Sequence, residues 1–359
     1  MFEARIDKLL ARMESDGLDA LLITSLPNVY YLSGYTGSTA TLVLTRRNKW
    51  FLTDFRYHEQ FATEVWPGWT LVDNTGRKLV GEALPGLEDA SRLNRMGFES
   101  NVVTHAMYAK LLADEAREYV PTEGWVEELR LIKDDSEIEK LRAAVQLNER
   151  IFTELLELIK PETTEAQLAA EIHFRALMYG AKGYSFEPIV ASGVHASKPH
   201  AGFTTEPLVR GAPLTIDMGV QLDGYCSDMT RTVFVADCPP EWEKVYNLVR
   251  EAKDLAFAAI RPGKLGRDID AVARDLIYGA GFEGKFEHGL GHGVGVEVHE
   301  GPTLSKMGDK ELRPGMVVTD EPGIYLPGQG GVRIEDMLVV REDGAEILNT
   351  LDTELRVVG

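Results

Sequence analysis

The stretch 214-LTIDMGVQLDGYCSDMTRTVFV-235 contains two apolar runs of the kind that form β-strands. They flank a turn-forming tripeptide, Leu222-Asp223-Gly224. Apolar runs on either side of an Asp-Gly turn predict a β-hairpin. Each half of this hairpin carries one aspartate, Asp217 or Asp228. Their relative placement decides what kind of site this part of the fold can hold.

The hairpin register determines how the two aspartates face each other. A two-residue loop at 222–223 places Asp217 directly opposite Asp228, whereas a loop at 223–224 pairs Asp228 with Gly219. Because side chains alternate between the faces of a strand, both registers put the two carboxylates on one face, within about 4.5–8 Å of each other. A three-residue loop would separate them.

Two carboxylates at this spacing raise each other's pKa, and a divalent ion that binds both removes the repulsion. The hairpin therefore predicts a cation site. The alternative is a pair of solvated aspartates beside a turn, and the hairpin alone does not distinguish the two interpretations.

A second cluster lies in 286-FEHGLGHGVGVEVHE-300, which holds three of the chain's eight histidines: His288, His292 and His299. Its four glycines make a helix improbable, because each costs roughly 1 kcal/mol relative to alanine, and they favour an extended, closely packed backbone. Neutral imidazole is a common metal ligand and titrates near neutral pH. The cluster therefore predicts a metal ligand and a proton donor, although a single histidine would more often be structural.

Two glutamates, Glu321 in 319-TDEPGIY-325 and Glu335 in 331-GVRIEDM-337, each adjoin an apolar run that we expect to be buried. A buried carboxylate without a partner costs several kcal/mol unless it binds a cation or hydrogen-bond donors. Metal binding is one interpretation of the pair. A salt bridge to Arg333 is the other.

Taken together, these residues form a hard, oxygen-rich ligand set, whose members are Asp217, Asp228, His292, Glu321 and Glu335. Four carboxylates carry a charge of about −4, which two divalent ions would cancel. We expect two ions per chain, with Mn²⁺ first and Co²⁺ or Zn²⁺ as alternatives.

The segments around this set predict a mixed α and β domain. Ser136 followed by Glu139 matches a capping box, and the apolar spacing after it predicts a helix from about residue 137 to Pro161. Further helices are expected over 164–180, 241–261 and 266–279. Strand-like runs separate them at 214–221, 231–236, 316–321 and 335–340. Antiparallel hairpins, rather than a doubly wound sheet, are predicted.

The first ~125 residues contain strand-like runs at 19–25, 40–45 and 50–54 between turn-rich stretches, and no catalytic cluster. A chain of 359 residues exceeds the size at which one hydrophobic core stops growing. We expect two domains that meet between residues 125 and 135.

The composition limits the possible functions. A formal net charge of −19 argues against nucleic-acid or membrane binding as the main function. The start, MFEARIDKLLARMESDG, predicts an amphipathic helix rather than a signal peptide, and no apolar run approaches the roughly 18 residues that cross a bilayer. Two cysteines, Cys226 and Cys238, suit a reducing compartment, so we expect a cytoplasmic protein.

At these residues the sequence resembles the creatinase and aminopeptidase P family, which includes prolidases, Xaa-Pro aminopeptidases and methionine aminopeptidases. HGLGHGVGVEVHE at 288–300 is similar to the prolidase signature, and the Asp, Asp, His, Glu, Glu set is present in order. The resemblance implies an α+β fold. It consists of a pita-bread catalytic domain with internal pseudo-symmetry over 129–359 and a smaller α/β creatinase-like domain over 1–128.

The resemblance also implies a role for each ligand. Asp217 would hold one metal ion and His292 and Glu321 the other, while Asp228 and Glu335 would bridge both. Glu321 would be the general base in metal-assisted hydrolysis of the bond before proline.

Other residues would act on the substrate. His299 and His200, the latter in 198-KPHAG-202, would contact the peptide and stabilise the oxyanion or the leaving imino group. The resemblance further implies substrate-binding or supporting roles for His288, Tyr325 and Arg333. The expected partner is a peptide with proline in second position, and the expected assembly is a homodimer.

Three other members of this fold family are alternatives. A methionine aminopeptidase would resemble the catalytic domain alone, a creatinase-like enzyme works without metals, and a non-catalytic peptide-binding module has usually lost the ligands. A prolidase, limited to dipeptides, is harder to separate from an Xaa-Pro aminopeptidase. The stretches 28-NVYYLSGYTGS-38 and 52-LTDFRYHEQ-60 resemble short bacterial Xaa-Pro aminopeptidases and favour the latter.

Overall fold

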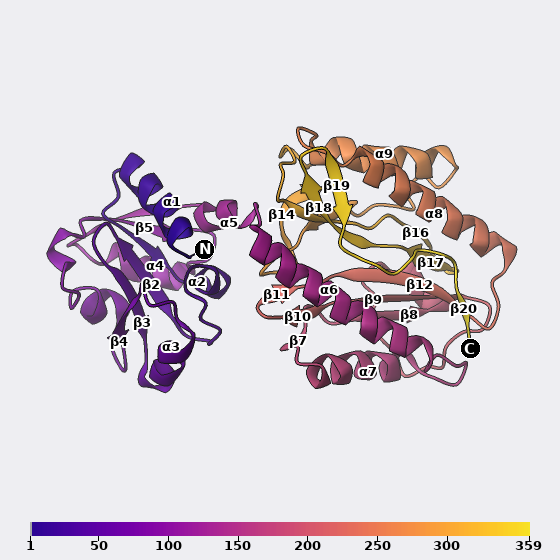
Figure 1. The fold of residues 1–359 in the computed structure, drawn as a ribbon, viewed down its shortest axis with the longest axis horizontal. Coiled ribbons are helices and arrows are strands. Elements are labelled where there is room, and N and C mark those ends of the chain that lie inside the picture. Colours follow the sequence, from indigo (N-terminus) through magenta and orange to yellow (C-terminus); the bar gives the residue numbers. More distant parts are fainter. Residues whose placement is uncertain (1) are drawn as a thin grey trace. The chain divides into compact units, whose positions relative to one another are not determined.

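The computed structural model describes residues 2–359, and the chain divides into two compact units, Met1–Arg130 and Leu131–Gly359 (Figure 1). Each unit has its own hydrophobic core.

The N-terminal unit is built on a mixed sheet. The described strands lie in the order β4 (Thr70–Asp73), β3 (Lys49–Thr53), β2 (Thr41–Thr45), β1 (Ala20–Ile23), β5 (Arg95–Glu99) and β6 (Glu118–Thr122). The pairs β1–β2 and β2–β3 are antiparallel, and the other neighbours are parallel. Strands β1, β2 and β3 confirm the three predicted runs of this half.

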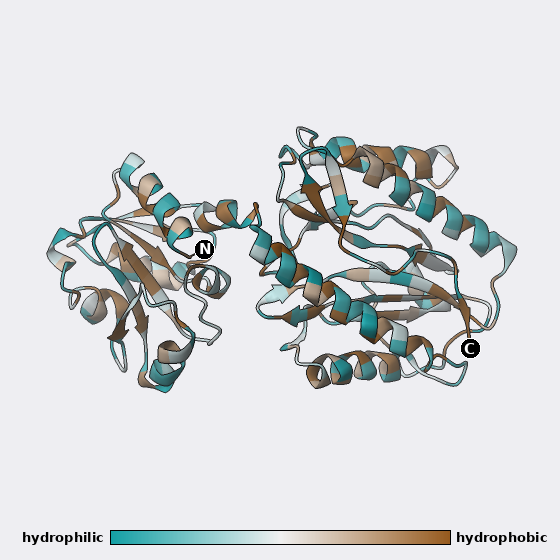
Figure 2. Ribbon diagram, viewed as in Figure 1, coloured by the Kyte–Doolittle hydropathy of each residue, from teal (hydrophilic) through white to brown (hydrophobic). Residues whose placement is uncertain are grey.

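Short helices surround this sheet. They are α1 (Phe2–Ser15), α2 (Leu26–Ser33), α3 (His58–Glu64), α4 (His105–Leu112) and α5 (Trp125–Arg130), with single turns η1 (Phe55–Tyr57), η2 (Leu79–Ala83) and η3 (Ala90–Arg92). Helix α1 confirms the predicted amphipathic start, because Ile6, Leu9 and Met13 are buried along one face. Figure 2 shows the apolar strands of the sheet between more polar helical faces.

Four long helices frame the C-terminal unit: α6 (Asp135–Leu156), α7 (Glu165–Met178), α8 (Pro240–Ala259) and α9 (Gly266–Gly279). The predicted cap of α7 is confirmed, because Thr164 and Gln167 form a capping box. The predicted cap of α6 is wrong. Its capping box joins Asp134 to Glu137, two residues earlier, and the helix ends at Leu156, ahead of Pro161.

The strands of this unit form several small sheets. One has the order β20-β12-β9-β8, with bounds Val357–Val358, Met229–Val235, Pro213–Met218 and Ile189–Ser192. Another has the order β14-β13-β15-β18-β19, with bounds Glu300–Leu304, Gly291–Gly293, Val317–Asp320, Asp336–Arg341 and Gly344–Ile347. Smaller ladders join β7 (Gly183–Tyr184), β10 (Val220–Leu222) and β11 (Tyr225–Cys226), and β16 (Gly323–Leu326) with β17 (Gly330–Arg333).

Two layered halves face each other in this unit. Helices α6 and α7 share one apolar core with β8, β9 and β12, and helices α8 and α9 share another with β15 and β18. Figure 1 shows the two helix pairs on opposite sides of the strands. This two-fold arrangement of helices outside strands is the pita-bread layout that the resemblance implied.

The hairpin of residues 214–235 adopts the second of the two registers that a two-residue loop allows. Leu222 pairs with Tyr225, and Met218 pairs with Met229, so the two-residue loop is Asp223-Gly224. Both loop residues have positive φ, 46° and 77°, as a type I′ turn requires.

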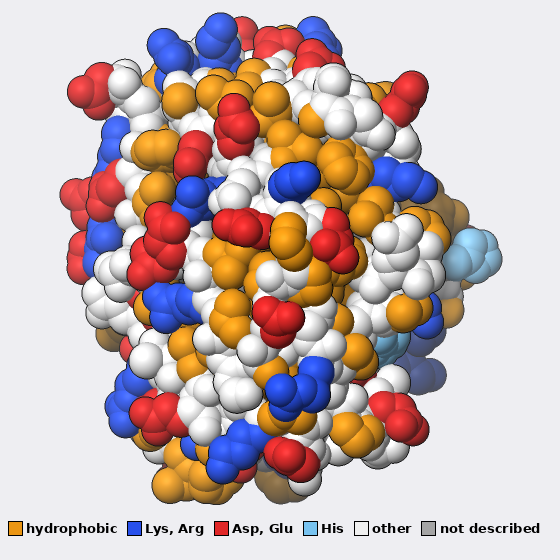
Figure 3. All heavy atoms as spheres, turned by 90° about the vertical axis from the view of Figure 1, so that its right-hand side faces the viewer, with side chains coloured by type: hydrophobic (Ala, Val, Ile, Leu, Met, Phe, Trp, Pro, Cys, Tyr) orange, Lys and Arg blue, Asp and Glu red, His pale blue; other side chains and the backbone are white. Residues whose placement is uncertain are grey.

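None of the described helices is long and apolar enough to span a membrane. Figure 3 views the C-terminal unit end-on and shows acidic and basic side chains interspersed with apolar ones. The acidic excess is therefore not concentrated on that face.

Candidate metal centre

A cavity of about 610 Å³ lies within the C-terminal unit. We call it the central pocket. Its lining includes most of the residues singled out in the sequence: His200, Asp217, Asp228, His288, His292, His299, Glu321, Arg333 and Glu335. Tyr325 lies just behind the lining, against His288 and Arg333. Segments more than 100 residues apart in sequence thus meet in one place.

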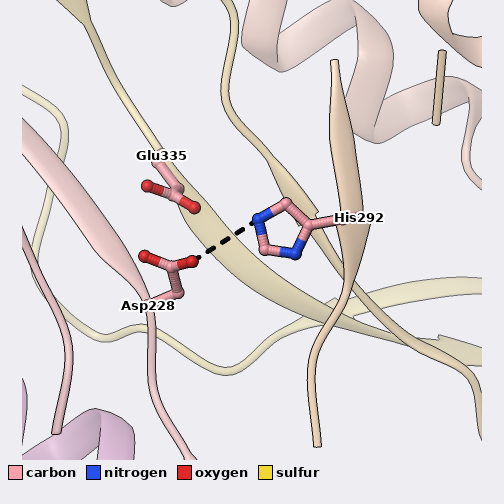
Figure 4. A group of neighbouring side chains, drawn as sticks. All are labelled: Asp228, His292 and Glu335. Atoms are coloured by element: carbon pink, nitrogen blue, oxygen red, sulfur yellow. Dashed lines mark ion pairs between the residues drawn. The ribbon is translucent and has the colours of Figure 1, made fainter. Parts of the chain in front are cut away.

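Three of the predicted ligands converge from three different strand segments. Asp228 precedes β12, Glu335 precedes β18 and His292 lies in β13. One ligand atom from each lies within 4.8 Å of the others. Figure 4 shows the two carboxylates and the imidazole directed toward one another, with Asp228 Oδ2 3.5 Å from His292 Nε2.

The backbone fixes the tautomer of His292. Its Nδ1 lies 3.1 Å from the carbonyl oxygen of Gly293 and must carry the proton that this hydrogen bond needs. Burial lowers the pKa of His292 to about 4, so the ring is neutral at pH 7. The lone pair on Nε2 then faces the carboxylates, which is the arrangement of a metal-binding histidine.

Glu321 completes this side of the pocket. Its Oε1 lies 3.4 Å from His292 Nε2 and accepts a hydrogen bond from Thr319 Oγ1 at 3.2 Å. Burial raises the pKa of Glu321 to about 8, with Arg333 opposing the shift and Asp217 adding to it. The carboxyl group is therefore a strong proton acceptor when no cation is near.

Asp217 has a different neighbour. Its Oδ2 pairs with Arg333 Nη2 at 2.7 Å, and both side chains are buried. The salt-bridge interpretation considered for the two glutamates is thus realised at Asp217. Oδ1 of Asp217 has no hydrogen-bond partner among the described residues and stays available to a cation.

The pocket concentrates negative charge beyond what the protein itself neutralises. Burial and the neighbouring carboxylates raise the pKa of Asp228 and that of Glu335 well above their ordinary values. Oε1 of Glu335, like Oδ1 of Asp217, is buried without a hydrogen-bond partner in the part of the chain that the structure describes. Orphaned carboxylate oxygens, a neutral imidazole and mutual repulsion together fit divalent metal ions.

His288 belongs to a hydrogen-bonded chain beside the ligands. Arg333 Nη1 donates to Tyr325 Oη at 2.7 Å, and Tyr325 Oη lies 3.0 Å from His288 Nε2. His288 Nδ1 lies 2.7 Å from the carbonyl of Gly289. Burial and Arg333 lower the pKa of His288 to about 3, so the ring is neutral, donates from Nδ1 and accepts from Tyr325.

His299 and His200 occupy the open side of the pocket, and both side chains are exposed. The His299 ring lies 4.5 Å from that of His292, centroid to centroid. His200 lies in the loop after β8, far in sequence from the histidine and glycine cluster at 286–300. The structure therefore brings all three clustered histidines and the distant His200 to one cavity.

Close backbone packing explains the glycines of this cluster. A Cβ at Gly291 would lie 2.1 Å from the carbonyl oxygen of Thr319, and one at Gly293 would lie 1.9 Å from that of Gly301. Only glycine allows β13 to approach its neighbours this closely. The predicted extended, closely packed backbone is confirmed.

Sequence reasoning missed the hydroxyl groups that hold the ligands. Thr230 Oγ1 donates to Glu335 Oε2 at 2.7 Å, and Thr319 Oγ1 contacts both Glu321 and the backbone N–H of His292. Strand alternation could have found them, since Thr319 lies two residues from Glu321 and Thr230 two residues from Asp228.

A second buried charge cluster lies on the other face of the same strands and was also missed. Asp336 pairs with Arg231 at 2.7 Å and with Lys253 at 2.6 Å. Arg231 Nη1 also donates to the backbone oxygen of Glu335 at 2.5 Å. The cluster thus ties β12 and α8 to the segment that carries a predicted metal ligand.

Known proteins resemble the chain over both units. Residues 139–342 match metallopeptidase family M24, and residues 5–132 match the creatinase/prolidase N-terminal domain. An uncharacterised peptidase of Bacillus subtilis is 39% identical over 355 residues, which cover 99% of this chain and 100% of that protein.

Two solved structures are close in both fold and sequence. An Xaa-Pro dipeptidase from Bacillus anthracis gives a TM-score of 0.95 at 35% identity and covers 100% of both chains. An X-Pro aminopeptidase from Thermotoga maritima gives 0.90 at 33% identity, over 97% of this chain and 100% of that chain. These matches confirm the predicted two-domain α+β fold and the family that the motifs indicated.

Proposed function

Because the chain belongs to metallopeptidase family M24 and is a metal-dependent peptidase, we propose that it removes the first residue from peptides that have proline in second position. This is the activity of an Xaa-Pro aminopeptidase. Its structural neighbours include both an Xaa-Pro dipeptidase and an X-Pro aminopeptidase, so proline specificity is common to them and peptide length is not.

Five residues would hold two divalent ions: Asp217, Asp228, His292, Glu321 and Glu335. Four carboxylates balance the charge of two ions, and the set of oxygens with one imidazole nitrogen suits Mn²⁺, with Co²⁺ and Zn²⁺ as alternatives. When bound, such ions lower the pKa of water and polarise the peptide carbonyl.

Glu321 is the best-placed base in the pocket. Thr319 orients its carboxylate, and its high pKa without a cation reflects a strong affinity for protons. Glu321 would accept a proton from the attacking water and return it to the departing proline nitrogen.

His299 and His200 are exposed to the pocket and can reach a bound peptide from its open side. Their ring N–H groups would donate to the oxygen of the tetrahedral intermediate or to the leaving imino group. His288 serves differently, because its two nitrogens are engaged by Tyr325 and Gly289. It would shape the pocket rather than transfer protons.

The proposed preference for peptides longer than two residues rests on one observation. Among the described residues that line the pocket, Arg333 is the sole lysine or arginine, and its three nitrogens bind Thr230, Tyr325, Pro199 and Asp217. A dipeptide places a free carboxylate directly after proline, and the described lining of the pocket offers no unengaged lysine or arginine to bind it. A tripeptide avoids that cost, since its charge lies one residue further on.

The test compares Ala-Pro with Ala-Pro-Ala at saturating Mn²⁺. We expect kcat/KM to be at least about tenfold higher for the tripeptide, a difference of about 1.4 kcal/mol. Glu321→Gln should remain folded and lose the activity, which controls for contaminating peptidases. A preference for the dipeptide would assign the protein as a prolidase instead.

A further inference from the structure

The loop of residues 193–203 brings His200 to the pocket, together with Pro199, Ala201 and Gly202. The His200 side chain is exposed and makes no hydrogen bond or ion pair with the described residues. Its position therefore depends on how the backbone of this loop is held. The loop begins at the end of β8 and contains only a short 3₁₀ turn, Gly193–Ser197.

Glu165 closes the base of this loop. Its carboxylate accepts hydrogen bonds from the backbone N–H of Ser192 at 2.7 Å and of Thr204 at 2.8 Å. Thr204 Oγ1 donates as well, at 2.9 Å, and His195 Nδ1 lies 3.0 Å away. One side chain thus binds both ends of the loop and a residue inside it.

The position of Glu165 is itself rigid. It is the first residue of α7, where a negative charge is stabilised by the helix N-terminus, and it is 3% exposed. The backbone adds further ties at the same place, because Ala166 N–H donates to Thr204 O and Leu208 N–H donates to Thr163 O, each at 2.9 Å. The loop base is therefore fixed to a helix of the core.

A second hydrogen bond anchors the loop next to His200. Arg333 Nη1 donates to the carbonyl oxygen of Pro199 at 3.2 Å while its Nη2 pairs with Asp217. Glu165 holds the ends of the loop, and Arg333 holds its middle against the predicted metal ligands.

We propose that Glu165 is a positioning residue that fixes His200 in the pocket without touching the substrate. The proposal rests on the proposed function for the role of His200. Removing the carboxylate leaves backbone donors unpaired and loosens the base of the 193–203 segment, and a shift of about 1 Å in a substrate-contacting group can cost up to about 100-fold in rate.

Glu165→Gln tests the proposal, because the isosteric amide puts an N–H₂ group against either Ser192 N–H or Thr204 N–H. We expect kcat/KM for Ala-Pro-Ala to fall by about tenfold with Mn²⁺ content unchanged. Glu149→Gln is the matched control. Glu149 is also buried, at 5% exposed, and binds Thr350 N–H, Thr350 Oγ1 and Leu351 N–H at 2.6–2.9 Å, away from the pocket.

A double-mutant cycle separates positioning from general damage. If Glu165 acts through His200, Glu165→Gln should have little further effect in a His200→Ala background, whereas Glu149→Gln should have the same small effect in both. Equal losses from Glu165→Gln with and without His200 would overturn the proposal.

Hydrogen–deuterium exchange gives a readout that needs no activity. Amides in residues 192–204 should exchange faster in Glu165→Gln than in the wild type, and unchanged exchange there would overturn the proposal. Thr204→Val, which removes one donor to the carboxylate, serves if the first variant does not fold. A wild type that fails to cleave Ala-Pro-Ala would contradict the proposed function alone, since the exchange result still decides whether Glu165 anchors the loop.

Discussion

Glu335 and Asp336 are adjacent in sequence and buried to 1% and 2% exposure, but they lie in opposite electrostatic surroundings. Asp336 faces two cations, Arg231 and Lys253. Burial alone would raise the pKa of Asp336, and these two partners instead lower it below its ordinary value. On the pocket side, burial and the carboxylates of the other ligands raise the pKa of Glu335.

The difference shows how one strand segment supplies both a structural and a functional charge. Where a carboxylate is structural, the chain provides its own cations. Around Glu335, a predicted ligand, the chain places further carboxylates and leaves Oε1 without a partner among the described residues, so that cations from solution must complete the site.

The largest expected effect comes from neutralising the two neighbours in turn in the metal-free protein. Asp336→Asn should lower the free energy of unfolding by about 3–5 kcal/mol, because it leaves Arg231 and Lys253 buried without their carboxylate. Glu335→Gln should raise it by about 1 kcal/mol, because it removes repulsion and keeps an acceptor for Thr230. Urea unfolding in EDTA measures both. Destabilisation of similar size in the two variants would show that Glu335 and Asp336 do not differ in this way.

The same contrast predicts a pH dependence. The raised pKa values of Asp228, Glu335 and Glu321 mean that the folded metal-free protein holds protons that the unfolded chain releases. This contribution to stability is complete below the ordinary carboxylate pKa and is lost as pH rises through the folded values, about 8 for Glu321.

The melting temperature in EDTA should therefore fall by several degrees between about pH 5 and pH 8, while the Mn²⁺-loaded protein changes less. Differential scanning fluorimetry at matched pH gives the difference in melting temperature between the metal-free and Mn²⁺-loaded forms. This difference should increase as pH rises. In Glu335→Gln the difference in melting temperature between the two forms should be smaller. A difference that stays constant across this range would mean that the pocket carboxylates are already ionised without metal.

The smallest effect is expected at Asp320, which lies directly across from Asp336 in the β15–β18 ladder. Its two carboxylate oxygens have no hydrogen-bond partner within residues 2–359, and burial raises its pKa well above the ordinary value, with Lys253 opposing. Because burial favours the uncharged form of this carboxyl group, Asp320→Asn should change the free energy of unfolding by less than about 1 kcal/mol. A loss as large as that of Asp336→Asn would mean that Asp320 shares the charge of Lys253.

The sequence predicts much of this contrast through strand alternation. Parity alone places Asp217 and Asp228 on one face, whichever two-residue loop forms. It does not choose the register, which depends on Asp223 and Gly224 both adopting positive φ. Parity also implies that Asp336 faces away from Glu335, but it does not show which cations lie there, because Lys253 comes from a helix 83 residues earlier.

Two overlapping capping-box patterns explain why the predicted N-cap of α6 is wrong. Asp134 with Glu137 and Ser136 with Glu139 both satisfy the capping-box pattern, two residues apart. The structure uses the first pair, and Glu137 also accepts a hydrogen bond from the buried Tyr225 at 2.9 Å. That contact spans 88 residues, so local sequence does not reveal it. Glu165 was missed for the same reason, since its partners lie 27 to 39 residues away.

We infer that the pocket holds more carboxylate charge than Arg333 neutralises, so that two divalent ions can bind. The most direct test is the metal content of protein stripped with EDTA, reloaded with Mn²⁺, freed of excess metal and measured by plasma mass spectrometry. We expect about two ions per chain in the wild type and fewer in Glu335→Gln. A wild type that binds no Mn²⁺, or a Glu335→Gln variant that binds as much Mn²⁺ as the wild type, would contradict this inference.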